Sequence, residues 1–188
     1  MPDFSSCAKK LGASFNNLDL LVEALTHRSY LNEHREYVGS HNERLEFLGD
    51  AVLELAVTDF LFKKFPAKSE GELTSYRAAL VNTVSLAECA QALGIGDFLL
   101  LSKGEQKDVG RAREVILADA FEAIIGAMYL DSGFTAAEQF IAKNLYSRID
   151  DIIAKRSYQD AKSRFQEIAQ EKRGTTPRYE TLSEVGPD

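Results

Sequence analysis

The sequence of 188 residues predicts an all-α fold, and three observations support this prediction. Apolar residues recur at helical spacing along most of the chain, and residues typical of helix starts and stops separate these stretches. The sixteen-residue stretch from Val115 to Leu130 carries only two charges. Because a helix that is apolar on every side is a buried helix, this segment is expected at the centre of the domain.

Five helices are expected before the middle of the chain: 4–11, 18–25, 42–64, 70–81 and 83–93. Asn17 or Asp19 is suited to begin the second of these, and Pro66 ends the third. Ser69 and Glu72 have the spacing of a capping box at the start of the fourth. Residues 31–41 are polar and are expected to form a loop.

The second half continues with a charged, glycine-containing loop at 102–113, followed by the apolar helix. Gly133 is expected to stop that helix, and Thr135 with Glu138 has capping-box spacing for another helix that reaches about residue 154. The next expected elements are a linker at 155–159, a helix at 160–173 and a strand at 178–182.

One helix and one strand cannot bury their own apolar side. The predicted division is therefore a helical domain over 1–155, followed by a linker and the fragment of a second, α+β domain over 156–188.

The segment 42–50 (NERLEFLGD) places three carboxylates on one side of its expected helix. At 100° per residue, Glu43, Glu46 and Asp50 fall within about 60° of one another. Like charges at this spacing repel, so the arrangement destabilises the protein unless a cation binds there. Glu54 lies near the same stripe and is expected on a solvated face, whereas the spacing alone places Phe47 in the core.

The apolar stretch carries its two acids, Asp119 and Glu122, at i, i+3. A buried carboxylate costs several kcal/mol unless it is protonated, paired or bound to a metal. The pair is surrounded by small residues that would let the helix with Glu46 and Asp50 approach closely: Ala118, Ala120, Ala123, Gly126 and Ala127. Four carboxylates on facing helices suit oxygen coordination of Mg²⁺ or Mn²⁺. The structural alternative is an ion pair of Asp119 with Arg44 or Arg77.

Composition indicates a globular protein with 45% hydrophobic and 27% charged residues and a net charge of −7. No apolar stretch reaches the length of a membrane span and no leader is recognisable, so no membrane association is expected.

Cys7 and Cys89 form neither a ligand pattern nor a disulfide framework, which favours a cytoplasmic location. The negative charge argues against purely electrostatic binding of nucleic acid, although bound divalent ions would offset part of it. His27, His34 and His41 are not at ligand spacing.

Four segments of the chain resemble the bacterial ribonuclease III family. The longest are HNERLEFLGDAVL (41–53) and ILADAFEAIIGAMYLD (116–131), and the supporting ones are ALTHRSY (24–30) and GELTSYRAALV (71–81). The similarity covers about residues 4–155. From about residue 158, the chain is similar to the opening of the family's double-stranded-RNA-binding domain, and the later strands and final helix of that domain are not in this sequence.

The resemblance implies a Mg²⁺-dependent endoribonuclease that acts on double-stranded RNA as a homodimer, with Mn²⁺ as a substitute cofactor. It assigns the metal to Glu46, Asp119 and Glu122, catalysis to Asp50 and Glu122, and a supporting role to Glu43. Phe47 matches an aromatic residue that such enzymes insert into the other subunit. The opening of the second domain adds two residues that match contacts to ribose hydroxyls in the minor groove, namely Gln166 and Glu167.

The resemblance further implies products with 5′-phosphate and 3′-hydroxyl ends and a role in processing rRNA and other RNAs.

Three alternatives remain open at this stage. An all-helical nucleoside-triphosphate pyrophosphohydrolase also uses acids at i, i+3, but the roughly 70 residues between the two acidic pairs exceed a helical hairpin. A ferritin-like di-metal oxidase requires a Glu-x-x-His motif, whereas the second acidic pair here is Asp-x-x-Glu. An RNA-binding relative without catalysis would be expected to lack one of the acids.

Overall fold

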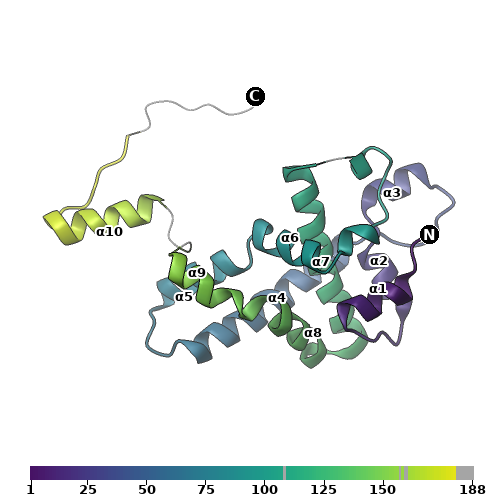
Figure 1. Cartoon of the computed structure of the whole chain (residues 1–188), viewed down its shortest axis with the longest axis horizontal. Helices are drawn as coiled ribbons and strands as arrows, with labels where there is room; N and C mark the ends of the chain where they lie inside the picture. Colours follow the sequence, from purple (N-terminus) through teal and green to yellow (C-terminus); the bar gives the residue numbers. More distant parts are fainter. Residues whose placement is uncertain (108, 157, 159–160, 181–188) are drawn as a thin grey trace.

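The computed structural model describes residues 1–107, 109–156, 158 and 161–180 (Figure 1). Ten α-helices run through these residues: α1 (Phe4–Leu11), α2 (Leu18–Ala24), α3 (Arg28–Glu33), α4 (Glu43–Lys64), α5 (Glu70–Leu80), α6 (Thr83–Ala92), α7 (Arg111–Ser132), α8 (Phe134–Ile141), α9 (Arg148–Lys155) and α10 (Ala161–Arg173). Within the described chain, extended pairing is limited to one bridge between Thr26 and Leu100. The all-α prediction is therefore confirmed.

The core is built around α7, which packs against α4, α6, α8 and α2. Its residues Phe121, Ile124 and Ile125 are completely buried, as the near absence of charges in this segment predicts. The neighbouring helices each contribute one apolar side to this core, so α7 behaves as the axis of the domain. No helix in the described part of the chain is both long and apolar enough to cross a lipid bilayer.

Helix boundaries follow the capping residues of the sequence. Asn17 caps α2 by accepting a hydrogen bond from the backbone N–H of Asp19, at 3.1 Å. The capping box of α5 is present in both directions, since Ser69 Oγ accepts from the Glu72 N–H and the Glu72 carboxylate accepts from the Ser69 N–H. These two starts were predicted from the same residue types.

Two expectations for the local structure are wrong. The short helix α3 occupies part of the polar segment that was expected to be a loop, and none of its residues is buried, so apolar spacing could not reveal it. The predicted capping box of Thr135 and Glu138 does not form: α8 begins at Phe134, two residues before the start that a Thr135 cap would give, and Gly133 is its N-cap.

The expected continuous helix up to residue 154 is also divided. A π-helical segment at Ala142–Tyr146 separates α8 from α9. Tyr146 lies in this segment, stacks on Phe60 with ring centroids 3.8 Å apart, and donates its hydroxyl to the carbonyl oxygen of Ala56 at 3.0 Å. These contacts with α4 fix the wider turn in place.

The C-terminal part of the chain leaves the helical body after α9. Figure 1 shows α10 set apart from the other helices. Helix α10 ends at Arg173, and Gly174 follows it with a φ of 63° in the left-handed region, as expected for a helix stop. Residues 178–180 have no regular structure, and the last two residues of the expected strand lie outside the described residues. The division into two domains at residue 155 stays a prediction.

Candidate metal centre

Helices α4 and α7 cross with their backbones in direct contact. A Cβ atom built on Gly49 would lie 1.8 Å from the carbonyl oxygen of Glu122, and one on Gly126 would lie 2.2 Å from the carbonyl oxygen of Leu45. Only glycine fits at either position, so each helix contributes one glycine to the crossing. This approach was expected from the small residues of the apolar segment, with α4 as the partner.

The crossing brings together Glu46 from α4 and Asp119 and Glu122 from α7. One carboxylate oxygen of each residue lies within 4.8 Å of the others. Among the residues that the structure describes, no other three His, Cys, Asp or Glu side chains meet at such distances. Three converging carboxylate oxygens fit a hard divalent ion such as Mg²⁺ or Mn²⁺.

The pKa values of these carboxyls show the cost of bringing them together. Burial raises the pKa of Glu122 to about 8, and the nearby carboxylates of Asp50 and Asp119 contribute to the increase. Burial and then the charge of Asp119 raise the pKa of Glu46. Burial also raises the pKa of Asp119, and the imidazole of His27 partly opposes this effect. A divalent cation would relieve the repulsion among all three.

The other two predicted acids flank the cluster. Asp50 is solvent-exposed on α4, one turn after Glu46, and its charge acts on both Glu46 and Glu122. Glu43 is exposed at the start of α4, where its carboxylate lies 3.3 Å from Nη1 of Arg28 and 3.8 Å from Nδ1 of His41. Glu43 is therefore already paired with the guanidinium of Arg28, which fits a supporting position better than a ligand position.

The structural alternative for Asp119 does not hold. No ion pair joins Asp119 to an arginine anywhere in the described chain. The guanidinium of Arg77 instead pairs with Glu54 at 2.8 Å and donates to Thr58 Oγ1 at 2.9 Å. Glu54 thus forms an ion pair while its side chain stays 37% exposed.

Phe47 is not a core residue, although its spacing placed it there. Its side chain is 81% exposed on the outer side of α4, next to the acidic cluster.

Gln166 and Glu167 lie on α10, and Gln166 is partly exposed. A contact that the sequence did not indicate joins His27 to Glu105: Nδ1 of His27 lies 2.7 Å from Oε2 of Glu105.

Comparison with known proteins agrees with this geometry. A family model described as Ribonuclease-III-like matches residues 17–149. Ribonuclease 3 of Geobacillus sp. (strain WCH70) is 50% identical over 184 residues, which cover 98% of this chain and 74% of the relative. The nuclease domain of ribonuclease III from Campylobacter jejuni is 44% identical, with a TM-score of 0.67 over 76% of this chain and 98% of that domain. Dicer from Pichia stipitis, at 26% identity, has a TM-score of 0.54 over 98% of this chain and 77% of that protein. The chain therefore belongs to the ribonuclease III-like family of metal-dependent endoribonucleases.

Proposed function

We propose that this chain hydrolyses the phosphodiester bonds of double-stranded RNA and leaves 5′-phosphate and 3′-hydroxyl ends. The observation that carries the proposal is the convergence of Glu46, Asp119 and Glu122 at the crossing of α4 and α7 in a ribonuclease III-like fold. The class of substrate would include rRNA precursors and other structured RNAs.

Glu46, Asp119 and Glu122 would hold Mg²⁺, and Mn²⁺ offers the same charge and oxygen preference. When bound, such an ion supplies a water of lowered pKa and stabilises negative charge on the phosphate. The resemblance of its segment to the family motif also assigns Glu122 to the catalytic set, and its proton has to leave before the cluster can take up a cation. Asp50 is exposed beside the cluster and is the carboxylate available to orient a water or accept its proton.

Double-stranded RNA would be recognised mainly by its A-form shape and its 2′-hydroxyls. In this proposal Gln166 and Glu167 on α10 contact ribose hydroxyls in the minor groove, as the first helix of a double-stranded-RNA-binding domain does. Such contacts select RNA over DNA with little readout of sequence.

The active form in this proposal is a homodimer built on α4. Phe47, Leu55 and Phe62 are 81%, 59% and 69% exposed, and at 100° per residue they lie within about 80° of one another. A 22-residue helix with such a continuous apolar face is expected to be covered by a partner.

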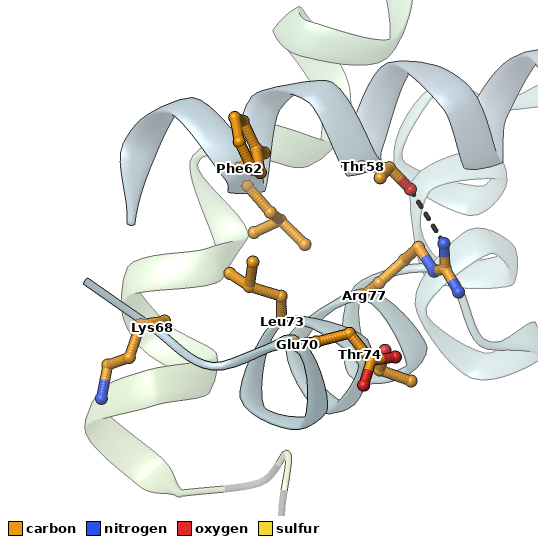
Figure 2. Close-up of a pocket in the computed structure, with 8 residues that line it drawn as sticks. Thr58, Phe62, Lys68, Glu70, Leu73, Thr74 and Arg77 are labelled. Carbon is orange, nitrogen blue, oxygen red and sulfur yellow. Dashed lines mark hydrogen bonds between the residues drawn. The ribbon is translucent and has the colours of Figure 1, made fainter. Parts of the chain in front are cut away.

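A pocket of about 370 Å³ lies where a partner's Phe47 could enter (Figure 2). It opens between the C-terminal half of α4 and the start of α5, with Phe62 and Leu73 on its apolar side and Arg77 bound to Thr58 at its other end. A two-fold axis across α4 brings the N-terminal half of one helix against the C-terminal half of its copy. Phe47 of each subunit would then meet this pocket in the other.

The test is cleavage of a long, perfectly paired RNA at low salt, with Mg²⁺ and with EDTA. The wild-type chain is expected to cut the duplex to short fragments only with Mg²⁺. Glu122→Gln is expected to reduce cleavage by more than about 100-fold, because even supporting residues around a metal contribute 10–100-fold. Glu114→Gln, on α7 but outside the cluster, is the matched control and should cleave normally.

Two other outcomes would contradict the proposal. Binding of the duplex without cleavage would identify a binding-only relative. Cleavage that persists in EDTA, or in the Glu122→Gln variant, would remove the metal centre from the chemistry.

A further inference from the structure

His27, Ser29 and Glu105 form a hydrogen-bonded cluster outside the three converging carboxylates. Nδ1 of His27 lies 2.7 Å from Oε2 of Glu105, and Ser29 Oγ donates to the same carboxylate oxygen at 2.7 Å. Nδ1 of His27 also lies 2.9 Å from Ser29 Oγ and accepts a hydrogen bond from the Ser29 N–H at 3.3 Å. His27 is thus oriented by a side chain far away in the sequence, and Nε2 is left on the opposite edge of the ring.

The same cluster fixes the loop that carries Glu105. Ser29 Oγ accepts a hydrogen bond from the Ser102 N–H at 3.0 Å, and Ser102 Oγ accepts one from the Glu105 N–H at 3.2 Å. On the other side, the His27 N–H donates to the Leu100 carbonyl at 3.0 Å. The loop 100–105 is therefore tied to residues 27–29 at several points.

The segment 26–27 is in turn bonded to the first turn of α4. The Thr26 carbonyl accepts from the Asn42 N–H at 2.9 Å, and the Asn42 carbonyl accepts from the Glu46 N–H at 2.9 Å. A displacement of this segment would therefore be transmitted to the backbone of Glu46. The segment contacts a predicted metal ligand on α4 through two consecutive hydrogen bonds.

His27 also acts on the ligand from the other helix. Its imidazole is the neighbouring group that lowers the pKa of Asp119, against the larger raising effect of burial. In metal sites, residues that hold the ligands from behind determine ligand orientation and metal affinity.

We propose that His27 and Glu105 are positioning residues of the metal centre: their cluster with Ser29 fixes residues 26–29, and this segment supports the first turn of α4, which carries Glu46. This inference rests on the proposed function, since it requires that Glu46, Asp119 and Glu122 bind a divalent ion. Neither residue contacts the substrate in this proposal. Their substitution should weaken the binding of the metal without preventing catalysis once metal is bound.

The test measures Mn²⁺ binding to the RNA-free protein at fixed pH by calorimetry. His27→Asn and Glu105→Gln are each expected to raise the dissociation constant by about 10-fold or more, the scale typical of residues that support metal ligands. The double variant should be no weaker than the weaker single variant, because both changes break one contact. His34→Asn is the matched control, since His34 pairs with Glu36 at 3.4 Å on the surface.

A second measurement separates positioning from simple loss of structure. Cleavage by both variants should return to within about twofold of wild type at saturating Mn²⁺, because the chemistry itself is intact. Amide exchange at Ser102 should become faster in Glu105→Gln, since the acceptor of its N–H is Ser29, which Glu105 holds.

Dissociation constants within twofold of wild type in both variants, or independent effects that multiply in the double variant, would overturn this inference alone. Cleavage that stays low at saturating Mn²⁺ would also overturn it and would give His27 a direct part in catalysis. Absence of Mn²⁺ binding in the wild type would overturn both the proposed function and the positioning role.

Discussion

At the scale of single residues, the carboxyl of Glu122 contributes strongly to the dependence of stability on pH. Its folded-state pKa of about 8 lies above the ordinary value of 4.5, so between these pH values the folded state binds more protons than the unfolded state. The free energy of unfolding of the metal-free protein should therefore fall as pH rises from about 4.5 to about 8 and change little above. Mn²⁺ should bind more tightly over the same interval, because the proton competes with the metal.

Glu122→Gln removes this titration. At pH 8 the metal-free variant is expected to be more stable than wild type by on the order of 2 kcal/mol, a value discounted for partial exposure to solvent. At pH 4.5 the two proteins should unfold at nearly the same denaturant concentration. Urea unfolding at both pH values, in EDTA, measures this difference. A variant that is less stable than wild type at pH 8 would show that Glu122 makes a stabilising contact instead.

The acids of this site could be predicted from the sequence because each pair sits at i, i+3 or i+4 in an apolar segment, where a charge is conspicuous. The contact of His27 with Glu105 could not be predicted. Both residues stand in ordinary polar surroundings, and the loop that carries Glu105 has no periodicity. Only the tertiary structure shows that they meet. Phe47 was misplaced for the opposite reason, since an aromatic residue within an apolar pattern gives no sign that its side chain faces solvent.

At the scale of helices, the position of the acids depends on the contact between α4 and α7 at Gly49 and Gly126. Gly49→Ala would place a methyl group 1.8 Å from the carbonyl oxygen of Glu122, and backbone cannot move aside as a flexible side chain can. The change should destabilise the protein by about 3 kcal/mol, the upper part of the range for overpacking. Any folded fraction should bind Mn²⁺ weakly, because the two helices that carry the ligands are forced apart.

Gly71→Ala is the matched control, because Gly71 lies within α5 with nothing within 4 Å of an added Cβ. This substitution should stabilise the protein by about 0.5–1 kcal/mol, which is the cost of glycine in an exposed helix. Thermal unfolding of the three proteins gives both values. Equal stability of Gly49→Ala and wild type would mean that the crossing can widen at no cost.

Most helices could be predicted because capping residues and apolar spacing are local signals. Asn17 and the Ser69–Glu72 capping box are examples that the structure confirms. The division between α8 and α9 could not be predicted. It depends on Tyr146 reaching Phe60 and Ala56 on α4, and such a contact between distant segments has no trace in the local pattern.

At the scale of the whole molecule, the uncovered face of α4 determines the proposed assembly. Phe47→Ala should raise the dissociation constant of the dimer by about 30-fold, corresponding to about 2 kcal/mol for an aromatic side chain that fills a partner's pocket. The melting temperature of the dilute protein should not fall, because the side chain is 81% exposed within one subunit.

Sedimentation equilibrium over a range of concentrations measures the dissociation constant, and Val38→Ala is the control, since Val38 is 99% exposed in the loop before α4. Dissociation should also change the products. A dimer carries two symmetry-related sites and can cut both strands, whereas a monomer carries one and should leave single-strand nicks in the duplex. If Phe47→Ala remains dimeric at wild-type concentrations, the apolar face of α4 is not what holds the subunits together, and the pocket beside Phe62 has another occupant.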